Sequence, residues 1–138
     1  MTLPGTEGAS VIFWATNCEN EPLLKLLLAS GGDIKARRKD GGANPLMNAV
    51  FRRNDSLVRI LLDAGADLKA KCLAGKTPLI LAVEMQDLTV IKTLLKAGAD
   101  VEAKGSQGQT PDSVAKSRGN NQVIELLRKA RDGRIQGY

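Results

Sequence analysis

The sequence of 138 residues contains no histidine and few aromatic residues: one tryptophan, one tyrosine and two phenylalanines. Without histidine the chain cannot build Ser-His-Asp or Cys-His nucleophilic sites, or zinc sites with histidine ligands. The glycine pairs Gly31-Gly32 and Gly41-Gly42 lack the spacing of a phosphate-binding loop and the Lys-Ser/Thr that follows it. We therefore predict that the protein is not an enzyme and that it uses no metal and no cofactor.

Cysteine is also scarce, because Cys18 and Cys72 are the only two in the chain. Two cysteines cannot form a four-cysteine zinc site. The pattern described below places them two helix layers apart, and layers pack roughly 8–10 Å from one another. A disulfide cannot span that separation. We expect two free thiols and a reducing compartment, the cytoplasm or, in a eukaryotic cell, the nucleus.

Long apolar runs are missing as well. Met1 to Gly8 carries no basic residue, and the apolar stretch from Val11 to Ala15 is too short for a signal sequence or a membrane span. We expect a soluble chain that does not associate with a membrane. The net charge of +5 indicates an acidic partner but is too small to demonstrate nucleic-acid binding.

The chain does contain a repeated unit, which is clearest in the stretch GKTPLILAVEMQDLTVIKTLLKAGAD from Gly75 to Asp100. Thr77-Pro78 is typical of a helix start, because the hydroxyl can cap an early amide and proline fits the first turn. Apolar residues at helical spacing predict two helices, which Gln86-Asp87 separates. Gly98 supplies the left-handed residue that ends the second helix.

Copies of this unit recur along the chain. Their first glycines are 34, 33 and 33 residues apart, at Gly8, Gly42, Gly75 and Gly108. Each glycine is followed two residues later by a helix-capping residue, and in three copies by proline after that. The same register brings a small residue to one place in each first helix, at Ala15, Ala49, Ala82 and Ala115. The recurrence of several position types in register predicts four helix–turn–helix units.

A period of 33 residues with a Thr-Pro-Leu start resembles the ankyrin repeat, and GKTPLILA and KAGADVEAK carry the resemblance best. The resemblance covers roughly Gly8 to Ala130 and implies an all-α solenoid of four helix–turn–helix units with β-turn or hairpin-like loop tips. We divide the chain into an N-terminal tail at 1–7, repeat one (N-cap) at 8–38, repeat two at 39–71, repeat three at 72–104, repeat four (C-cap) at 105–131 and a C-terminal tail at 132–138. Arg131 stands where glycine ends the other second helices, so we expect Arg131 to Tyr138 to fray.

The resemblance also implies that partners bind to a concave side formed by the loop tips and the first helices. Carried over by position, the predicted partner-binding residues are Arg37, Arg38, Phe51, Arg52, Lys71, Leu73, Lys76, Glu84, Met85, Lys104, Ser117 and Arg118. Most of the charged members are basic, and Phe51 and Met85 would add an apolar spot of the kind found in interface cores. An ordinary solvated face, with Phe51 folded over its neighbour, is the alternative interpretation.

We expect the function to be binding of another protein through this basic concave face. The partner should present an acidic surface with an apolar protrusion, and the free chain should be monomeric. A small inhibitor or antagonist of one protein is the specific form that we favour. The alternative is binding of nucleic acid or another polyanion through the same face, although that face has no tyrosine or tryptophan on which bases could stack.

Two departures from the family pattern concern the first helices. Trp14 and Phe13 make the first unit unusually bulky, so they either seal the end of the stack or form an aromatic docking site. Family histidines that brace the Thr-Pro-Leu turns are replaced by Phe13, Met47, Ile80 and Ser113. The resemblance therefore does not determine the fine turn geometry at those places.

Overall fold

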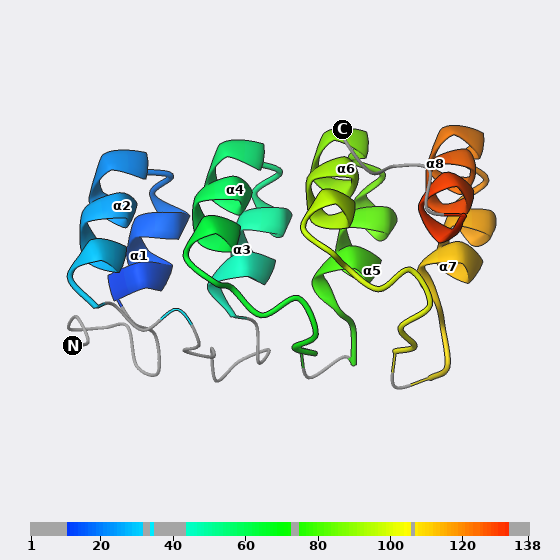
Figure 1. Ribbon diagram of the computed structural model, residues 1–138, viewed down its shortest axis with the longest axis horizontal. Helices are drawn as coiled ribbons and strands as arrows, with labels where there is room; N and C mark the ends of the chain where they lie inside the picture. Colours follow the sequence, from blue (N-terminus) through cyan, green and yellow to red (C-terminus); the bar gives the residue numbers. More distant parts are fainter. Residues whose placement is uncertain (1–10, 32–33, 35–43, 73–74, 106, 133–138) are drawn as a thin grey trace. The chain divides into compact units, whose positions relative to one another are not determined.

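The computed structural model describes residues 11–31, 34, 44–72, 75–105 and 107–132, which form eight α-helices and no strand (Figure 1). The helices occur in pairs: α1 (Val11–Asn17) and α2 (Glu21–Ala29), α3 (Pro45–Phe51) and α4 (Asp55–Asp63), α5 (Pro78–Met85) and α6 (Leu88–Lys96), α7 (Pro111–Arg118) and α8 (Asn121–Arg131). Each pair falls inside one of the four predicted repeats. The arrangement confirms the predicted fold class, an all-α repeat protein. None of the helices in the described ranges is long and apolar enough to cross a membrane.

The chain divides into two compact units, Met1–Asp67 and Leu68–Tyr138. In the first unit α1 packs against α2 and α3, and α4 packs against α3 and α2. In the second unit α5 packs against α6 and α7, and α8 packs against α7 and α6. In both units the first helices of neighbouring pairs contact each other more extensively than the second helices do.

Every helix from α2 onward starts at a side chain that caps it. The side-chain oxygens of Asn44, Thr77 and Thr110 accept hydrogen bonds from the amides three residues later, and proline follows each of them at the first helical position. This is the start that the Thr-Pro pattern predicts. The second helices are capped in the same way by Asn20, Asn54, Asp87 and Asn120.

Two of these capping asparagines also reach the preceding pair of their own unit. Asn54 Nδ2 donates to Glu19 Oε1 at 3.1 Å in the first unit, and Asn120 Nδ2 donates to Gln86 Oε1 at 3.2 Å in the second. The Oδ1 atom of each asparagine meanwhile accepts from the helix that it caps. One side chain therefore both starts a second helix and fixes its register against the neighbouring pair.

The turn inside each pair requires a left-handed residue. The φ angles of Glu19, Arg53 and Gln86 are 53°, 56° and 57°, and Gly119 takes the equivalent place with 70°. Only glycine adopts this conformation without strain. Glycines after the second helices, such as Gly98 with a φ of 99°, supply the predicted helix ends.

The core is aliphatic, as the scarcity of aromatic residues requires. The four equivalent alanines, Ala15, Ala49, Ala82 and Ala115, are fully buried, and they lie in the first helices, which contact each other more extensively than the second helices do. Three of the residues that replace the family histidines, Phe13, Met47 and Ile80, are fully buried too. The fourth, Ser113, closes a capping box with Thr110. Apolar packing or a capping box therefore supports the turns that histidine would brace.

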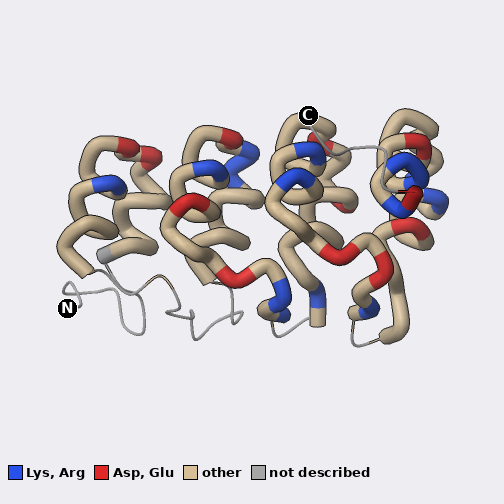
Figure 2. The backbone as a smooth tube through the Cα atoms, in the orientation of Figure 1, with Lys and Arg blue, Asp and Glu red and all other residues tan. Residues whose placement is uncertain are grey.

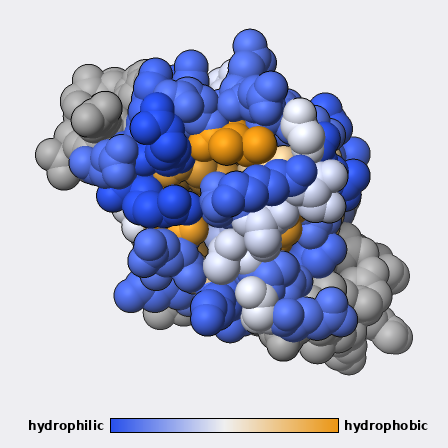
Figure 3. All heavy atoms as spheres, turned by 90° about the vertical axis from the view of Figure 1, so that its right-hand side faces the viewer, coloured by the Kyte–Doolittle hydropathy of each residue, from blue (hydrophilic) through white to orange (hydrophobic). Residues whose placement is uncertain are grey.

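The two aromatic residues of α1 behave differently. Phe13 is fully buried, whereas Trp14 remains 43% exposed. Phe13 therefore belongs wholly to the core of the first unit, and the indole of Trp14 keeps surface available for contact. In the last pair of the second unit, Val114 and Ile124 are only half-buried, so this pair also keeps apolar surface exposed. Figure 3 looks onto this side and shows apolar atoms bordered by hydrophilic ones.

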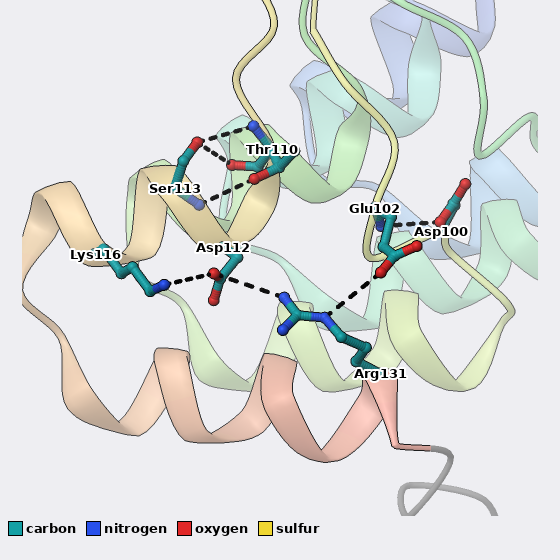
Figure 4. Close-up of polar contacts among 7 residues, drawn as sticks. All are labelled: Asp100, Glu102, Thr110, Asp112, Ser113, Lys116 and Arg131. Atoms are coloured by element: carbon teal, nitrogen blue, oxygen red, sulfur yellow. Dashed lines mark hydrogen bonds and ion pairs between the residues drawn. The ribbon is translucent and has the colours of Figure 1, made fainter.

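The prediction that fraying begins at Arg131 is wrong for Arg131 itself, and residues 133–138 lie outside the described residues. Arg131 is the last residue of α8, the longest of the described helices. Its guanidinium lies between Glu102 Oε1, at 3.7 Å, and Asp112 Oδ2, at 3.6 Å, and Asp112 also pairs with Lys116 (Figure 4). Arginine in place of the usual glycine thus extends the helix and ties its end to the start of α7 and to the preceding loop.

Candidate protein-binding site

A hollow of about 450 Å³ opens between α5 and α7 on the first-helix side of the second unit. Four of the predicted partner-binding residues line it: Lys76, Glu84, Ser117 and Arg118. Gln109, Ser113 and Val114 complete the lining. The structure therefore brings four of the residues that were predicted from the family to one concave place, and these four come from two helix pairs.

Lys76 and Glu84 form an ion pair inside this hollow. The Lys76 Nζ atom lies 2.7 Å from Glu84 Oε1 and 3.0 Å from Glu84 Oε2, and both side chains are half-buried. Lys76 precedes the helix-capping Thr77, and Glu84 lies two turns further along α5, so the pair joins the loop to its own helix. Because each charge neutralises the other, Lys76 adds no net positive charge for a partner.

Arg118 supplies the charge that remains. It is exposed at the end of α7 and makes no hydrogen bond or ion pair within the described part of the chain. Ser117 beside it is exposed, and Val114, one turn earlier, adds a half-buried apolar wall. The hollow thus offers one available cation, the Ser117 hydroxyl and an apolar surface, which suits an acidic side chain next to an apolar one.

The loop tips of the second unit have the predicted hairpin-like form. The Cys72 amide donates to the Lys76 carbonyl at 3.1 Å and the Gly75 amide to the Cys72 carbonyl at 2.8 Å, while the equivalent bonds from Gly105 and Gly108 close the next tip. Lys71 and Lys104 are exposed one residue before these turns, and Met85 is half-buried at the end of α5. Leu73 lies outside the described residues.

Phe51 and Arg52 belong to the first unit. Phe51 is 49% exposed at the end of α3. The Arg52 guanidinium donates to Asn17 Oδ1 at 3.4 Å, and the same oxygen accepts from the buried Asn48 at 2.6 Å. Arg37 and Arg38 lie outside the described residues. The apolar spot expected from Phe51 with Met85 draws on both units and stays a prediction.

The two cysteines are free, as predicted, with Cys18 exposed and Cys72 half-buried. In the described ranges no three residues among histidine, cysteine, aspartate and glutamate come together as a group that could hold a metal ion.

The predicted partner-binding residues lack three residues of the hollow, Gln109, Ser113 and Val114. The last two belong to α7. Their positions in α7 contained the signal, because Ser113 is four residues before Ser117 and Val114 is four before Arg118. Residues four apart share a helix face, so the predicted pair could have been extended by one turn.

The family model described as ankyrin repeats, in three copies, matches residues 11–105, so α7 and α8 lie beyond the matched segment. No curated protein matches the chain significantly.

Proposed function

Because its match covers more than half of the sequence, the chain belongs to the ankyrin-repeat family, and from this membership we propose that it binds another protein through the hollow between α5 and α7. Ankyrin repeats are general protein–protein interaction modules. The observation that carries the proposal is the presence of Lys76, Glu84, Ser117 and Arg118 around one concave place. The exposed loop-tip lysines Lys71 and Lys104 belong to the same unit and add positive charge to it.

The expected partner is acidic and carries an apolar side chain beside the acid. Arg118 can pair with a carboxylate, while Val114 receives the apolar group. The Lys76–Glu84 pair would lose its remaining water when a partner covers the hollow. Burying the pair costs desolvation free energy, but less than burying either charge alone, because the two charges compensate each other.

We further propose that the protein acts as a small inhibitor or antagonist, which an interaction module can do by covering a functional surface of its partner. The free thiols Cys18 and Cys72 support a reducing compartment. The free chain is expected to be monomeric.

Binding of nucleic acid or another polyanion is the competing function. Against it, Lys76 is already paired with Glu84, which leaves Arg118 as the available cation of the hollow. A polyanion usually requires several cations along its path. Salt separates the two functions, because phosphate-driven binding weakens steeply with ionic strength and an anchored apolar contact does not.

Affinity capture from an extract with quantitative mass spectrometry tests the proposal. The baits are the wild type, Arg118→Ala, the double variant Phe51→Ala/Met85→Ala, and Lys25→Ala on α2 as a control that is not among the predicted partner-binding residues. We expect a protein that the wild type and Lys25→Ala retain equally and that Arg118→Ala loses. If all four baits retain the same proteins, the proposed site is wrong.

A further inference from the structure

A second hollow, of about 540 Å³, lies between α6 and α8, on the second helices of the same unit. Leu88 and Leu126 are its apolar lining residues, and Lys92, Glu125 and Lys129 its charged ones. The hollow forms where the second helices contact each other less than the first helices do. No residue of the α5–α7 hollow lines it.

Leu88 breaks the pattern that the chain follows elsewhere at this place. It is the first residue of α6, whereas α2, α4 and α8 begin with Glu21, Asp55 and Asn121. A polar or acidic residue suits the start of a helix, since it interacts favourably with the helix dipole. Leu88 forgoes that interaction and stays only half-buried. Its apolar surface therefore faces the hollow at a position that the other repeats keep polar.

The charge around the hollow is positive. Lys129 is exposed and makes no hydrogen bond or ion pair within the described residues, and Lys92 adds a second exposed ammonium group. Both carboxylate oxygens of Glu125 accept from Arg128. These hydrogen bonds compensate the negative charge of Glu125, the one acid that lines the hollow. They also raise the pKa of the Arg128 guanidinium. Figure 2 shows Lys positions along α6 and Lys and Arg positions in the second half of α8.

We propose that this hollow is a second docking surface, which takes an acidic amphipathic segment of a partner protein. An apolar side chain of that segment lies over Leu88 and Leu126, and a carboxylate of the segment pairs with Lys129. Charge complementarity selects the acidic segment, and the apolar surface of Leu88 selects an amphipathic one. Because the two hollows lie on different helices, the chain can hold one segment on its first helices and another on its second helices.

The test uses peptides selected from a random display library on the intact immobilised protein. Selected peptides are synthesised with a fluorescent label, and their dissociation constants are measured by fluorescence anisotropy. Leu88→Asn copies the residue that begins α8 and removes only the apolar surface. Lys129→Gln removes only the charge. The matched controls are Lys25→Gln, which changes the lysine of α2 equivalent to Lys92, and Arg118→Ala at the other hollow.

We expect a class of selected peptides that combines acidic residues with a large apolar one. Each of Leu88→Asn and Lys129→Gln should weaken their binding at least about tenfold, while both controls bind as the wild type does. Melting curves by circular dichroism should show that Leu88→Asn folds normally. The inference is overturned if no such peptides are selected, if they bind both hollow variants unchanged, or if Arg118→Ala abolishes their binding.

Discussion

Replacing Arg53 by glycine should stabilise the first unit, because Arg53 occupies the left-handed turn between α3 and α4. Its φ is 56°, a conformation that costs an L-residue about 1–2 kcal/mol. The Arg53 side chain is exposed and makes no hydrogen bond or ion pair in the described structure, so its removal sacrifices no contact. Its backbone amide donates to the Val50 carbonyl at 3.0 Å, and glycine preserves this bond.

The gain is partly offset in the unfolded chain. Glycine has more conformational freedom to lose on folding, which costs about 0.5–1 kcal/mol. The net increase in the free energy of unfolding should therefore be about 0.5–1 kcal/mol. The reverse change provides the matched control. Gly119 holds the equivalent turn with a φ of 70°, and no atom lies within 4 Å of the place where a Cβ would stand, so Gly119→Ala should destabilise by strain alone.

Urea unfolding followed by tryptophan fluorescence measures the effect on the first unit, because Trp14 is the only tryptophan in the chain. Far-UV circular dichroism follows all helices and reports Gly119→Ala. Arg53→Gly should raise the urea midpoint and Gly119→Ala should lower it. A lowered midpoint for Arg53→Gly, or an unchanged one for Gly119→Ala, would refute the argument that backbone strain governs these turns.

Three further changes test the packing and the helix ends. Ala115→Leu should lower the free energy of unfolding by about 1–3 kcal/mol, since the fully buried alanine leaves no room for a larger side chain. Thermal unfolding followed by circular dichroism measures this loss. An unchanged stability would contradict close packing of α5 and α7. Asn54→Ala should lower the free energy of unfolding by about 1–2 kcal/mol. Asn54→Asp should recover part of this loss, because it restores the cap to Leu57 but not the bond to Glu19. Urea unfolding compares the two variants. Arg131→Ala should cost less than about 1 kcal/mol, because its ion pairs are partly exposed. That loss should shrink in high salt, and a loss independent of salt would argue against the ion pairs.

The helices and their starts could be predicted from the sequence because they depend on local chemistry. Asn44, Thr77 and Thr110 cap helices for reasons contained within four residues, and the period of the repeats sets which alanine each pair buries. Pairing between side chains was harder to predict. Lys76 and Glu84 were each expected to face a partner, and their ion pair depends on how the loop folds back over α5.

The error at Arg131 has a similar physical origin. A missing glycine indicates that the usual helix end is absent, but it does not indicate what replaces it. Here the replacement depends on Glu102 and Asp112, which lie well before Arg131 in the sequence and meet it only in the folded second unit. The pairing of α6 with α8 likewise determines the hollow at Leu88, which no local pattern describes.

The dual role of Asn54 and Asn120 bears on the order in which each unit forms. Each asparagine makes both its cap and its bond to the neighbouring pair only when the helix after it and the pair before it are both present. A second helix that starts to coil alone would leave the amide group without its protein acceptor, and would gain only part of the available stabilisation. Folding within a unit should therefore be cooperative, because a helix pair that has already formed stabilises the start of the next second helix.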